Sequence, residues 1–240
     1  FVYGIHARFR GHTSSIQALG ELRSDIFGTE PGNAGTFTGE ATQGLERFWQ
    51  QTLTLDASGV SNFGGFYSNI VQLNLVIEKL NTTSVVATAN KNYYLGLAYG
   101  MRAYYYFQMT RAWGDVVIQT DAVTTIDVSN LAKPSSPAAD VMALIKSDIE
   151  SSLANYGTDY SFRNTKSFWS KSATQMLKAE VFLWTAHRGG GTTDATTALN
   201  ALTDIRTNIP ALALQSSFAN VFASSNKGNS EIIFAIRFGL

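Results

Sequence analysis

Three histidines are the side chains in this sequence best suited to acid–base or metal chemistry: His6, His12 and His187. None of them has a partner at metal-ligand spacing, and no Glu-x-x-His motif occurs. The sequence also contains no cysteine, which excludes a thiolate zinc site and a cysteine nucleophile. We therefore predict no metal and no cofactor, and we predict structural roles for all three histidines.

Carboxylates gather around a glycine-rich segment, at Asp25, Glu30, Glu40 and Glu46. Glycoside hydrolysis uses two carboxyl groups that flank the scissile bond. The spacing of these four residues does not indicate that any two of them face each other. The sequence therefore predicts a protein that is not an enzyme, and an α-helical glycosidase is the weaker alternative.

The same part of the chain is richer in groups that bind ligands than in groups that react. Aromatic faces stack on the C–H faces of sugar rings, while amides and charged groups bind the sugar hydroxyls. Both kinds of group occur here, and the predicted ligand-binding residues are Arg23, Asp25, Asn33, Phe37, Arg47, Phe48, Trp49 and Asn62. The periodicity of Phe63 and Phe66 instead favours the core face of a helix. Whether the aromatic residues of 37–66 face a ligand or the core stays open.

Composition narrows the class of partner. The 240 residues carry 18 basic and 18 acidic side chains, so the formal net charge is zero, and no block of basic residues occurs. This excludes the electrostatic footprint of a nucleic-acid-binding protein. The hydrophobic fraction of 45% is typical of a packed chain, whereas the charged fraction is only 15%. A surface whose polar side chains are mostly neutral suits uncharged polar ligands such as sugars.

Helical periodicity dominates the elements that must position these groups. Apolar residues recur at helical spacing over five segments, which are residues 63–80, 90–113, 138–155, 170–187 and 194–208. The segment 90–113 is apolar on every side, which predicts a central helix. Pairing 63–80 with 90–113 and 138–155 with 170–187 gives helical hairpins like those of tetratricopeptide proteins, and 194–208 has no predicted partner. The pairs start about 75 residues apart, against the ~34 of a regular array.

Three further features complete the predicted mainly α fold. Residues 231–238 form an apolar run typical of a β-strand, which predicts a minor β element near the end of the chain. Ser136 and Pro137 predict a helix N-cap followed by proline at the first helical position. Arg102 and Asn74 fall on apolar helix faces, so we predict that both are buried and hydrogen-bonded rather than ligand-binding.

One segment of the central helix resembles the signature of the SusD/RagB family. It reads Gly96-Leu-Ala-Tyr-Gly-Met-Arg-Ala-Tyr-Tyr-Tyr-Phe-Gln-Met-Thr-Arg-Ala-Trp-Gly-Asp115. The matching positions are Gly96, Ala98, Arg102, Ala103, Tyr106, Phe107, Gly114 and Asp115. The resemblance extends in order to Leu22–Asp25, Tyr67–Asn74, Ala173–Trp184 and Ser230–Phe234, and so covers most of the chain. The family's usual Glu is Leu97 here, and its usual Pro after Gly-Asp is Val117.

The resemblance implies a function and a location. Family members are longer than this chain, so residues 1–240 are expected to form a single N-terminal, tetratricopeptide-like domain and to be a fragment of a longer protein. The expected protein is a lipid-anchored lipoprotein on the cell-surface face of the outer membrane, with the anchoring cysteine upstream of residue 1. It would bind glycans without catalysis and deliver them to a SusC-like TonB-dependent transporter. A peptide-capturing relative or a generic tetratricopeptide-type adaptor is the alternative.

Overall fold

The computed structural model describes residues 2–24, 48, 51–54, 63–125 and 132–238. Within these ranges the chain is mainly helical, as predicted. The longer helices are α1 (Val2–Arg10), α4 (Phe63–Thr82), α5 (Thr88–Trp113), α6 (Ala138–Tyr156), α7 (Lys171–Thr185) and α8 (Gly191–Asn208). The shorter elements are α2 (Thr13–Leu19), η1 (Glu21–Arg23), η4 (Ala186–Gly190), α9 (Phe218–Phe222) and η5 (Ser224–Asn226).

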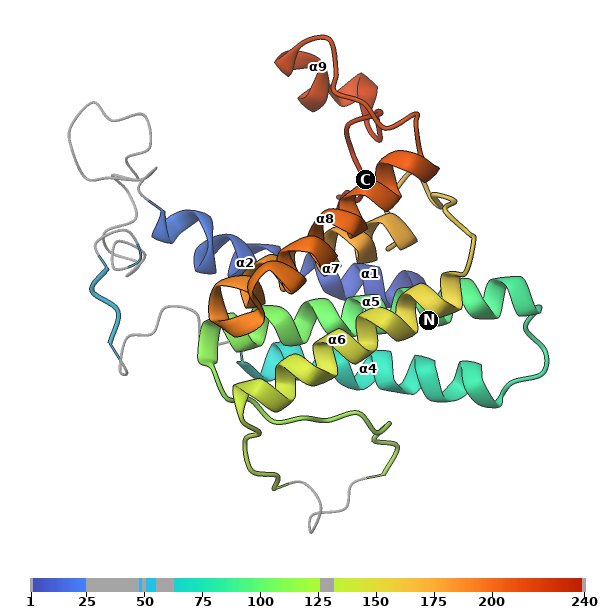
Figure 1. Cartoon of the computed structure of the whole chain (residues 1–240). Helices are drawn as coiled ribbons and strands as arrows, with labels where there is room; N and C mark the ends of the chain where they lie inside the picture. Colours follow the sequence, from blue (N-terminus) through green and yellow to red (C-terminus); the bar gives the residue numbers. More distant parts are fainter. Residues whose placement is uncertain (1, 25–47, 49–50, 55–62, 126–131, 239–240) are drawn as a thin grey trace.

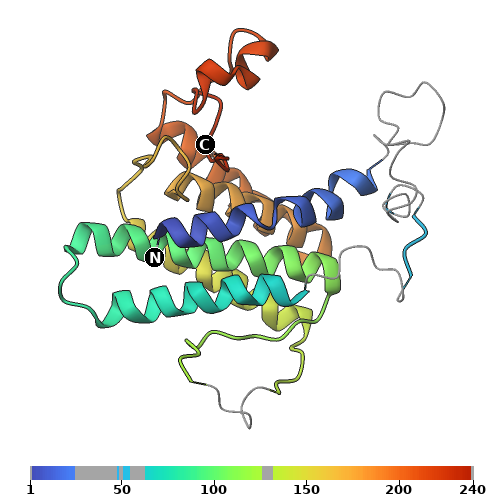
Figure 2. The ribbon, with the colours of Figure 1, turned by 180° about the vertical axis from the view of Figure 1, so that it is seen from behind.

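Helix α5 is the centre of the molecule, which confirms the prediction from its apolar residues on every side. Figure 1 shows α6 crossing in front of α5, and the opposite view in Figure 2 shows α1 crossing its other face. Helices α4, α6 and α7 all contact α5. Thirteen residues of α5 are buried, so the helix supplies a large share of the core. Burying a helix on all sides requires apolar side chains around its whole circumference.

The helices pair as antiparallel neighbours, with one difference from the predicted pairs. Helix α4 packs on α5, and α6 contacts both α5 and α7. Helix α8 packs along α7, although the sequence predicted no partner for it. Small residues make this last contact, since Ala179 of α7 meets Ala198 and Ala201 of α8 in a small separate cluster. Because alanine contributes little to a hydrophobic pattern, the periodicity of residues 194–208 did not indicate their partner.

The predicted strand at 231–238 is not formed. An isolated antiparallel bridge joins Val116 and Ser136, and no described residue of 231–238 is in a strand or bridge. The segment is instead irregular, and the Ala235 N–H donates to the carbonyl of Lys166 at 3.0 Å. Its apolar residues Ile233, Phe234 and Ile236 pack against the helical core. A short apolar run that packs on a core without regular structure has the same sequence pattern as a buried strand.

Helix α6 begins at residue 138, as does the predicted segment 138–155, but Pro137 is its N-cap residue rather than its first helical residue. The helix starts at Ala138, and the side chain of neither Ser136 nor Pro137 caps it. The Ala138 N–H donates instead to Oδ1 of Asp115 at 2.8 Å. A carboxylate is a strong acceptor for the free amide groups of a helix N-terminus. None of the described helices has both the length and the apolar character needed to span a membrane.

Candidate functional site

Most of the predicted binding residues lie outside the described part of the chain: Asp25, Asn33, Phe37, Arg47, Trp49 and Asn62. Arg23 ends the short helix η1, where only its backbone is described. Phe48 is described and is 1% exposed. The binding roles of all eight residues stay predictions. Phe66 is fully buried, as its periodicity predicted.

His6 is held by backbone groups on both ring nitrogens. Its Nδ1 lies 2.8 Å from the carbonyl oxygen of Val2, and its Nε2 accepts from the Trp169 N–H at 3.1 Å. This pairing fixes the neutral tautomer that carries its proton on Nδ1, because a carbonyl only accepts and an amide only donates. Burial lowers the pKa of His6, and the hydrogen bond to Val2 offsets part of the effect.

His12 has a different environment but also faces the core. It is buried against the rings of Phe66 and Tyr105, with ring centroids 4.9 and 6.0 Å away. Burial lowers its pKa as well. His187 is exposed in the turn between α7 and α8. The described residues contain no cluster of three or more histidine, cysteine or acidic side chains placed to hold a metal ion.

Arg102 is the centre of a buried polar junction, as predicted. Its Nε and Nη2 donate to the two carboxylate oxygens of Asp148, both at 2.7 Å, and its Nη1 donates to Oδ1 of Asn74 at 2.8 Å. The amide of Asn74 in turn donates to the carbonyls of Gln119 and Asp121 at 2.9 and 3.2 Å. Burial lowers the pKa of the Arg102 guanidinium, but the bonds and charge of Asp148 outweigh it, and the net pKa is raised. The junction joins α4, α5 and α6, so its role is structural.

Other residues of the family-like segment also support the fold. A Cβ atom at Gly96 would lie 2.7 Å from the ring of Tyr156, so only glycine allows α5 and α6 to approach this closely. Gly114 ends α5 with a φ of 73°, a conformation that favours glycine, and Asp115 caps α6 as described above. The described parts of this segment therefore explain a shared architecture rather than a shared ligand.

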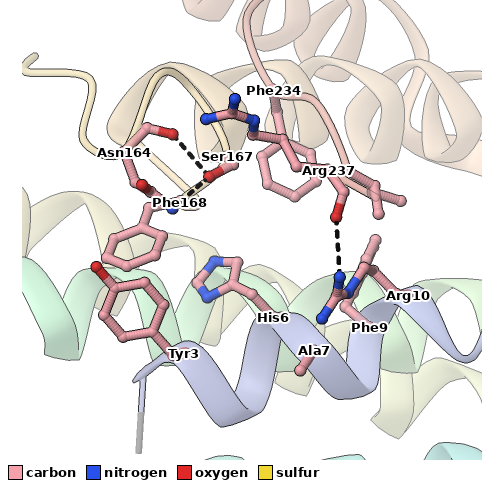
Figure 3. A pocket seen from close by; sticks show the side chains of 11 residues that line it. Tyr3, His6, Ala7, Phe9, Arg10, Asn164, Ser167, Phe168, Phe234 and Arg237 are labelled. Carbon is pink, nitrogen blue, oxygen red and sulfur yellow. Dashed lines mark hydrogen bonds between the residues drawn. The ribbon is translucent and has the colours of Figure 1, made fainter. Parts of the chain in front are cut away.

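A half-open cleft of about 260 Å³ lies between α1, the residues before α7 and the segment near residue 236. Figure 3 shows Tyr3 and Phe168 at one end, His6 in the middle and Arg10 at the other end. The ring of Phe168 stacks on His6 at 4.7 Å and meets Tyr3 edge-on at 5.1 Å. Tyr3 is 71% exposed, so much of its surface is open to a ligand.

The opposite wall of this cleft is formed by Phe234, Ile236 and Arg237. The ring of Phe234 packs edge-on against Phe9 at 5.8 Å. Arg10 donates from Nη1 to the carbonyl oxygen of Arg237 at 3.2 Å, which joins α1 to this wall. Aromatic walls with a few polar donors are the usual make-up of a small-molecule site.

Reasoning from the sequence missed this cleft. Its lining comes from three stretches far apart in the chain, around residues 3–10, 164–168 and 234–237. No local periodicity connects them, and the last stretch was expected to be a strand.

A second, larger groove of about 750 Å³ lies between α4 and residues 117–125. Phe63 and Tyr67 line one side, with Gln119, Asp121 and Lys133 on the other. Lys133 Nζ and Asp121 Oδ2 are 4.0 Å apart, so the groove contains both signs of charge. Phe63 packs on Trp113 with ring centroids 5.2 Å apart. The first cleft is the better defined of the two, because helix α1 and the packed segment 234–237 enclose it.

Comparison with known proteins identifies the family. Residues 24–183 match the SusD-like family model, whose description is "starch-binding associating with outer membrane". The SusD-like protein P38 of Formosa agariphila is 37% identical over 122 residues, which are 50% of this chain and 22% of that protein.

Solved structures agree with this match. The structure of B. fragilis NanU is 48% identical and superposes with a TM-score of 0.89, covering 99% of this chain and 46% of that chain. A structure solved with a xylogluco-oligosaccharide is 25% identical, with a TM-score of 0.72, and covers 94% of this chain and 42% of that chain. The chain thus spans less than half the length of these relatives, and it belongs to the SusD-like family.

Proposed function

We propose that this chain is the helical N-terminal domain of a cell-surface protein that binds glycans without cleaving them. The protein would be lipid-anchored to the outer membrane and would pass its ligand to a SusC-like TonB-dependent transporter. Membership of the SusD-like family supports the proposal, as does the relative that was solved with a xylogluco-oligosaccharide. The observation that carries it in this chain is the aromatic cleft between α1 and residues 234–237.

The cleft contains groups that can stack on a sugar ring and groups that can hydrogen-bond to its hydroxyls. The exposed ring of Tyr3 can stack on the C–H face of a pyranose, and Arg10 and the amide of Asn164 line the same space as hydrogen-bonding groups. His6 is the imidazole of the cleft, but backbone groups occupy both of its nitrogens. Because a general base needs a free nitrogen, this arrangement favours binding over bond cleavage.

The first test measures binding by the full-length protein. Affinity electrophoresis against a panel of neutral and acidic polysaccharides, followed by calorimetry with oligosaccharides, should find at least one glycan that binds. Tyr3→Ala should weaken that binding about tenfold, because a stacked aromatic ring contributes on the order of 1 kcal/mol. Phe222→Ala is the matched control, since Phe222 is also exposed at 71% but lies on α9, outside the cleft.

Two outcomes would contradict this function. Failure of the full-length protein to bind any glycan would remove the proposal, and co-purified peptides together with indifference to sugars would favour the peptide-capturing alternative. Unchanged oligosaccharide after long incubation is expected, and appearance of shorter products would restore the glycosidase alternative.

The partner and the location need separate experiments. A tagged full-length protein purified from outer membranes in mild detergent should bring the SusC-like transporter with it. Protease treatment of intact cells should degrade the protein, and mass spectrometry of its N-terminal peptide should show a lipid. A protein that resists protease in intact cells, or that purifies without a transporter, would contradict these parts of the proposal.

A further inference from the structure

Helices α7 and α8 expose apolar side chains, whereas α4, α5 and α6 expose no large hydrophobic residue. Met176 and Leu183 of α7 are 43% and 48% exposed, and Leu199 of α8 is 63% exposed. Met176 and Leu183 line a groove of about 630 Å³, together with Leu202 of α8 and residues 231–234. Exposed apolar side chains that gather at one groove indicate a contact surface, because exposed hydrophobic residues are otherwise scattered singly.

The charged groups of this groove already have partners. Its two charged residues are Glu180, which accepts from Arg111 at 2.7 Å, and Glu231, which accepts from the Gln215 N–H at 2.8 Å. The exposed hydrophobic side chains are aliphatic, so they cannot stack on a sugar ring as an aromatic face does. An anionic lipid surface attracts basic residues, whereas both charged residues here are acidic. The groove therefore suits the apolar surface of a protein.

The segment that forms one wall of the groove has backbone groups without partners. Ile233, Phe234 and Ile236 pack on the core, but their N–H groups donate no backbone hydrogen bond within the described residues. Only the intervening Ala235 does so, to the carbonyl of Lys166. A partly buried N–H group needs an acceptor. A polypeptide can supply such acceptors as well as apolar side chains.

The length of the relatives indicates which polypeptide covers the groove. This chain covers 46% of the chain of B. fragilis NanU, so a protein of that length has more than half of its residues elsewhere. In the proposed full-length protein these residues follow residue 240 and are joined to the wall at 231–234 by a short stretch of chain. Covalent attachment gives them an effective concentration on the order of millimolar at the groove, an advantage that a second copy lacks.

We infer that the part of the full-length protein that follows residue 240 packs apolar side chains into the groove between α7, α8 and residues 231–234. This inference rests on the proposal that the chain is the N-terminal domain of a longer protein, and it adds how the two parts are held together. Phe234 lines both this groove and the aromatic cleft beside α1. Docking at the groove therefore supports one wall of the proposed sugar site.

The first experiment measures accessibility in the full-length protein. Residues 1–240 contain no cysteine, so Met176→Cys and Leu183→Cys each place the only thiol of this part in the groove. Val85→Cys is the control, since Val85 is 89% exposed in the connection between α4 and α5. A maleimide, followed by mass spectrometry of each labelled peptide, should react at least tenfold more slowly at the groove than at the control. The rates should become equal in urea.

The second experiment identifies the occupant. A diazirine-bearing amino acid in place of Leu183 is activated by light in the native full-length protein. The cross-linked peptide should come from residues after 240 of the same polypeptide, and the product should run as a monomer on a denaturing gel. Circular dichroism of each variant, matched to wild type, ensures that the comparison is made on folded protein.

The outcomes separate this inference from the glycan-binding function. Groove cysteines that react within about threefold of Val85→Cys overturn the inference, and so does protection that appears only at high protein concentration or only with an added glycan. Cross-links to a second copy or to the transporter also overturn it. All of these results leave glycan binding intact. A protected groove in a protein that binds no glycan overturns the binding function alone.

Discussion

Two arginine environments divide this molecule into a part that holds the fold and a part that is open to ligands. Arg102 is buried, and its guanidinium bonds both oxygens of Asp148 and the amide oxygen of Asn74. Arg10 and Arg237 line an open cleft whose lining includes no carboxylate. A buried cation whose donors are satisfied by the protein has nothing left for a ligand. A cation that lines a cleft without a carboxylate partner can still donate hydrogen bonds to a ligand. The presence or absence of a carboxylate partner therefore distinguishes the two roles better than residue type does.

The largest expected effect is at the buried junction. Arg102→Met should lower the free energy of unfolding by about 3–5 kcal/mol, because it leaves the Asp148 carboxylate buried without its partner. Urea unfolding followed by circular dichroism measures this loss. The double variant Arg102→Met with Asp148→Leu should recover much of it, since no buried charge then remains. A single variant that unfolds like wild type would mean that the junction does not hold the fold.

The second largest expected effect is a loss of stability at a closely packed glycine of α5, compared with a glycine of α1 that faces open space. Gly96→Ala should destabilise the protein by about 1–3 kcal/mol, because the added methyl group meets the ring of Tyr156. Gly4→Ala on α1 is the control, since no atom lies within 4 Å of its added Cβ. That variant should be stabilising by up to about 1 kcal/mol, because alanine favours a helix over glycine. Similar effects at the two sites would break the distinction between a packed core and an open helix face.

A smaller effect concerns pH and the attachment of α1. The pKa of His6 is lowered in the folded protein, so the unfolded chain binds a proton more readily. The resulting stability is fully present above the unfolded value near 6.5 and is lost as pH falls through the lower folded pKa. Unfolding midpoints in urea should therefore fall between pH 7.5 and 5.

A matched pair of variants assigns this pH effect. His6→Gln keeps a hydrogen-bond acceptor for the Trp169 N–H but removes the titration, so it should flatten part of the decline. The remaining decline includes the contribution of His12, whose pKa is also lowered. His187→Gln, at an exposed position, should leave the profile unchanged. An unchanged profile in His6→Gln would mean that the histidine does not control the attachment of α1.

The smallest expected change in stability is at the two arginines of the cleft, which are compared here with the buried Arg102. Arg10→Gln and Arg237→Gln should each change the free energy of unfolding by less than about 0.5 kcal/mol, as substitutions of partly exposed residues usually do. The same two variants should weaken glycan binding, because both residues line the cleft. A loss of stability above about 1 kcal/mol in either variant would place that arginine with Arg102, among the residues that hold the fold.

Local patterns predicted the scaffold well. The all-round apolar pattern of 90–113 identified the central helix, and the polar residues Arg102 and Asn74 on apolar faces were correctly expected to be paired. These features can be predicted because residues three or four positions apart lie on the same face of a helix. Sequence spacing therefore indicates which side chains share an environment. The predicted start of the segment 170–187 is also confirmed, since the side chain of Ser170 caps α7 by accepting a hydrogen bond from the Ala173 N–H.

Features that depend on distant contacts could not be predicted in the same way. The cap of α6 comes from Asp115, which is 23 positions before Ala138, so the nearer Ser136 was the natural but wrong choice. The segment 231–238 has the apolar run of a buried strand, and only the structure shows that it packs on the core and contacts Lys166 without strand pairing. The cleft combines three separate stretches, while most of the predicted site falls on residues outside the described ranges.

The connection between α5 and α6 is fixed at both ends, and this affects how its sequence can vary between related proteins. The bridge between Val116 and Ser136 and the bond from Ala138 to Asp115 fix both ends of the connection. Lengthening or shortening the residues between these two anchors adds only a small loop-closure entropy, because the helices on either side are already in position. Evolution can therefore exchange the part of this connection between Asp121 and Ser136 while α5, α6 and the buried junction, which includes the carbonyls of Gln119 and Asp121, stay unchanged.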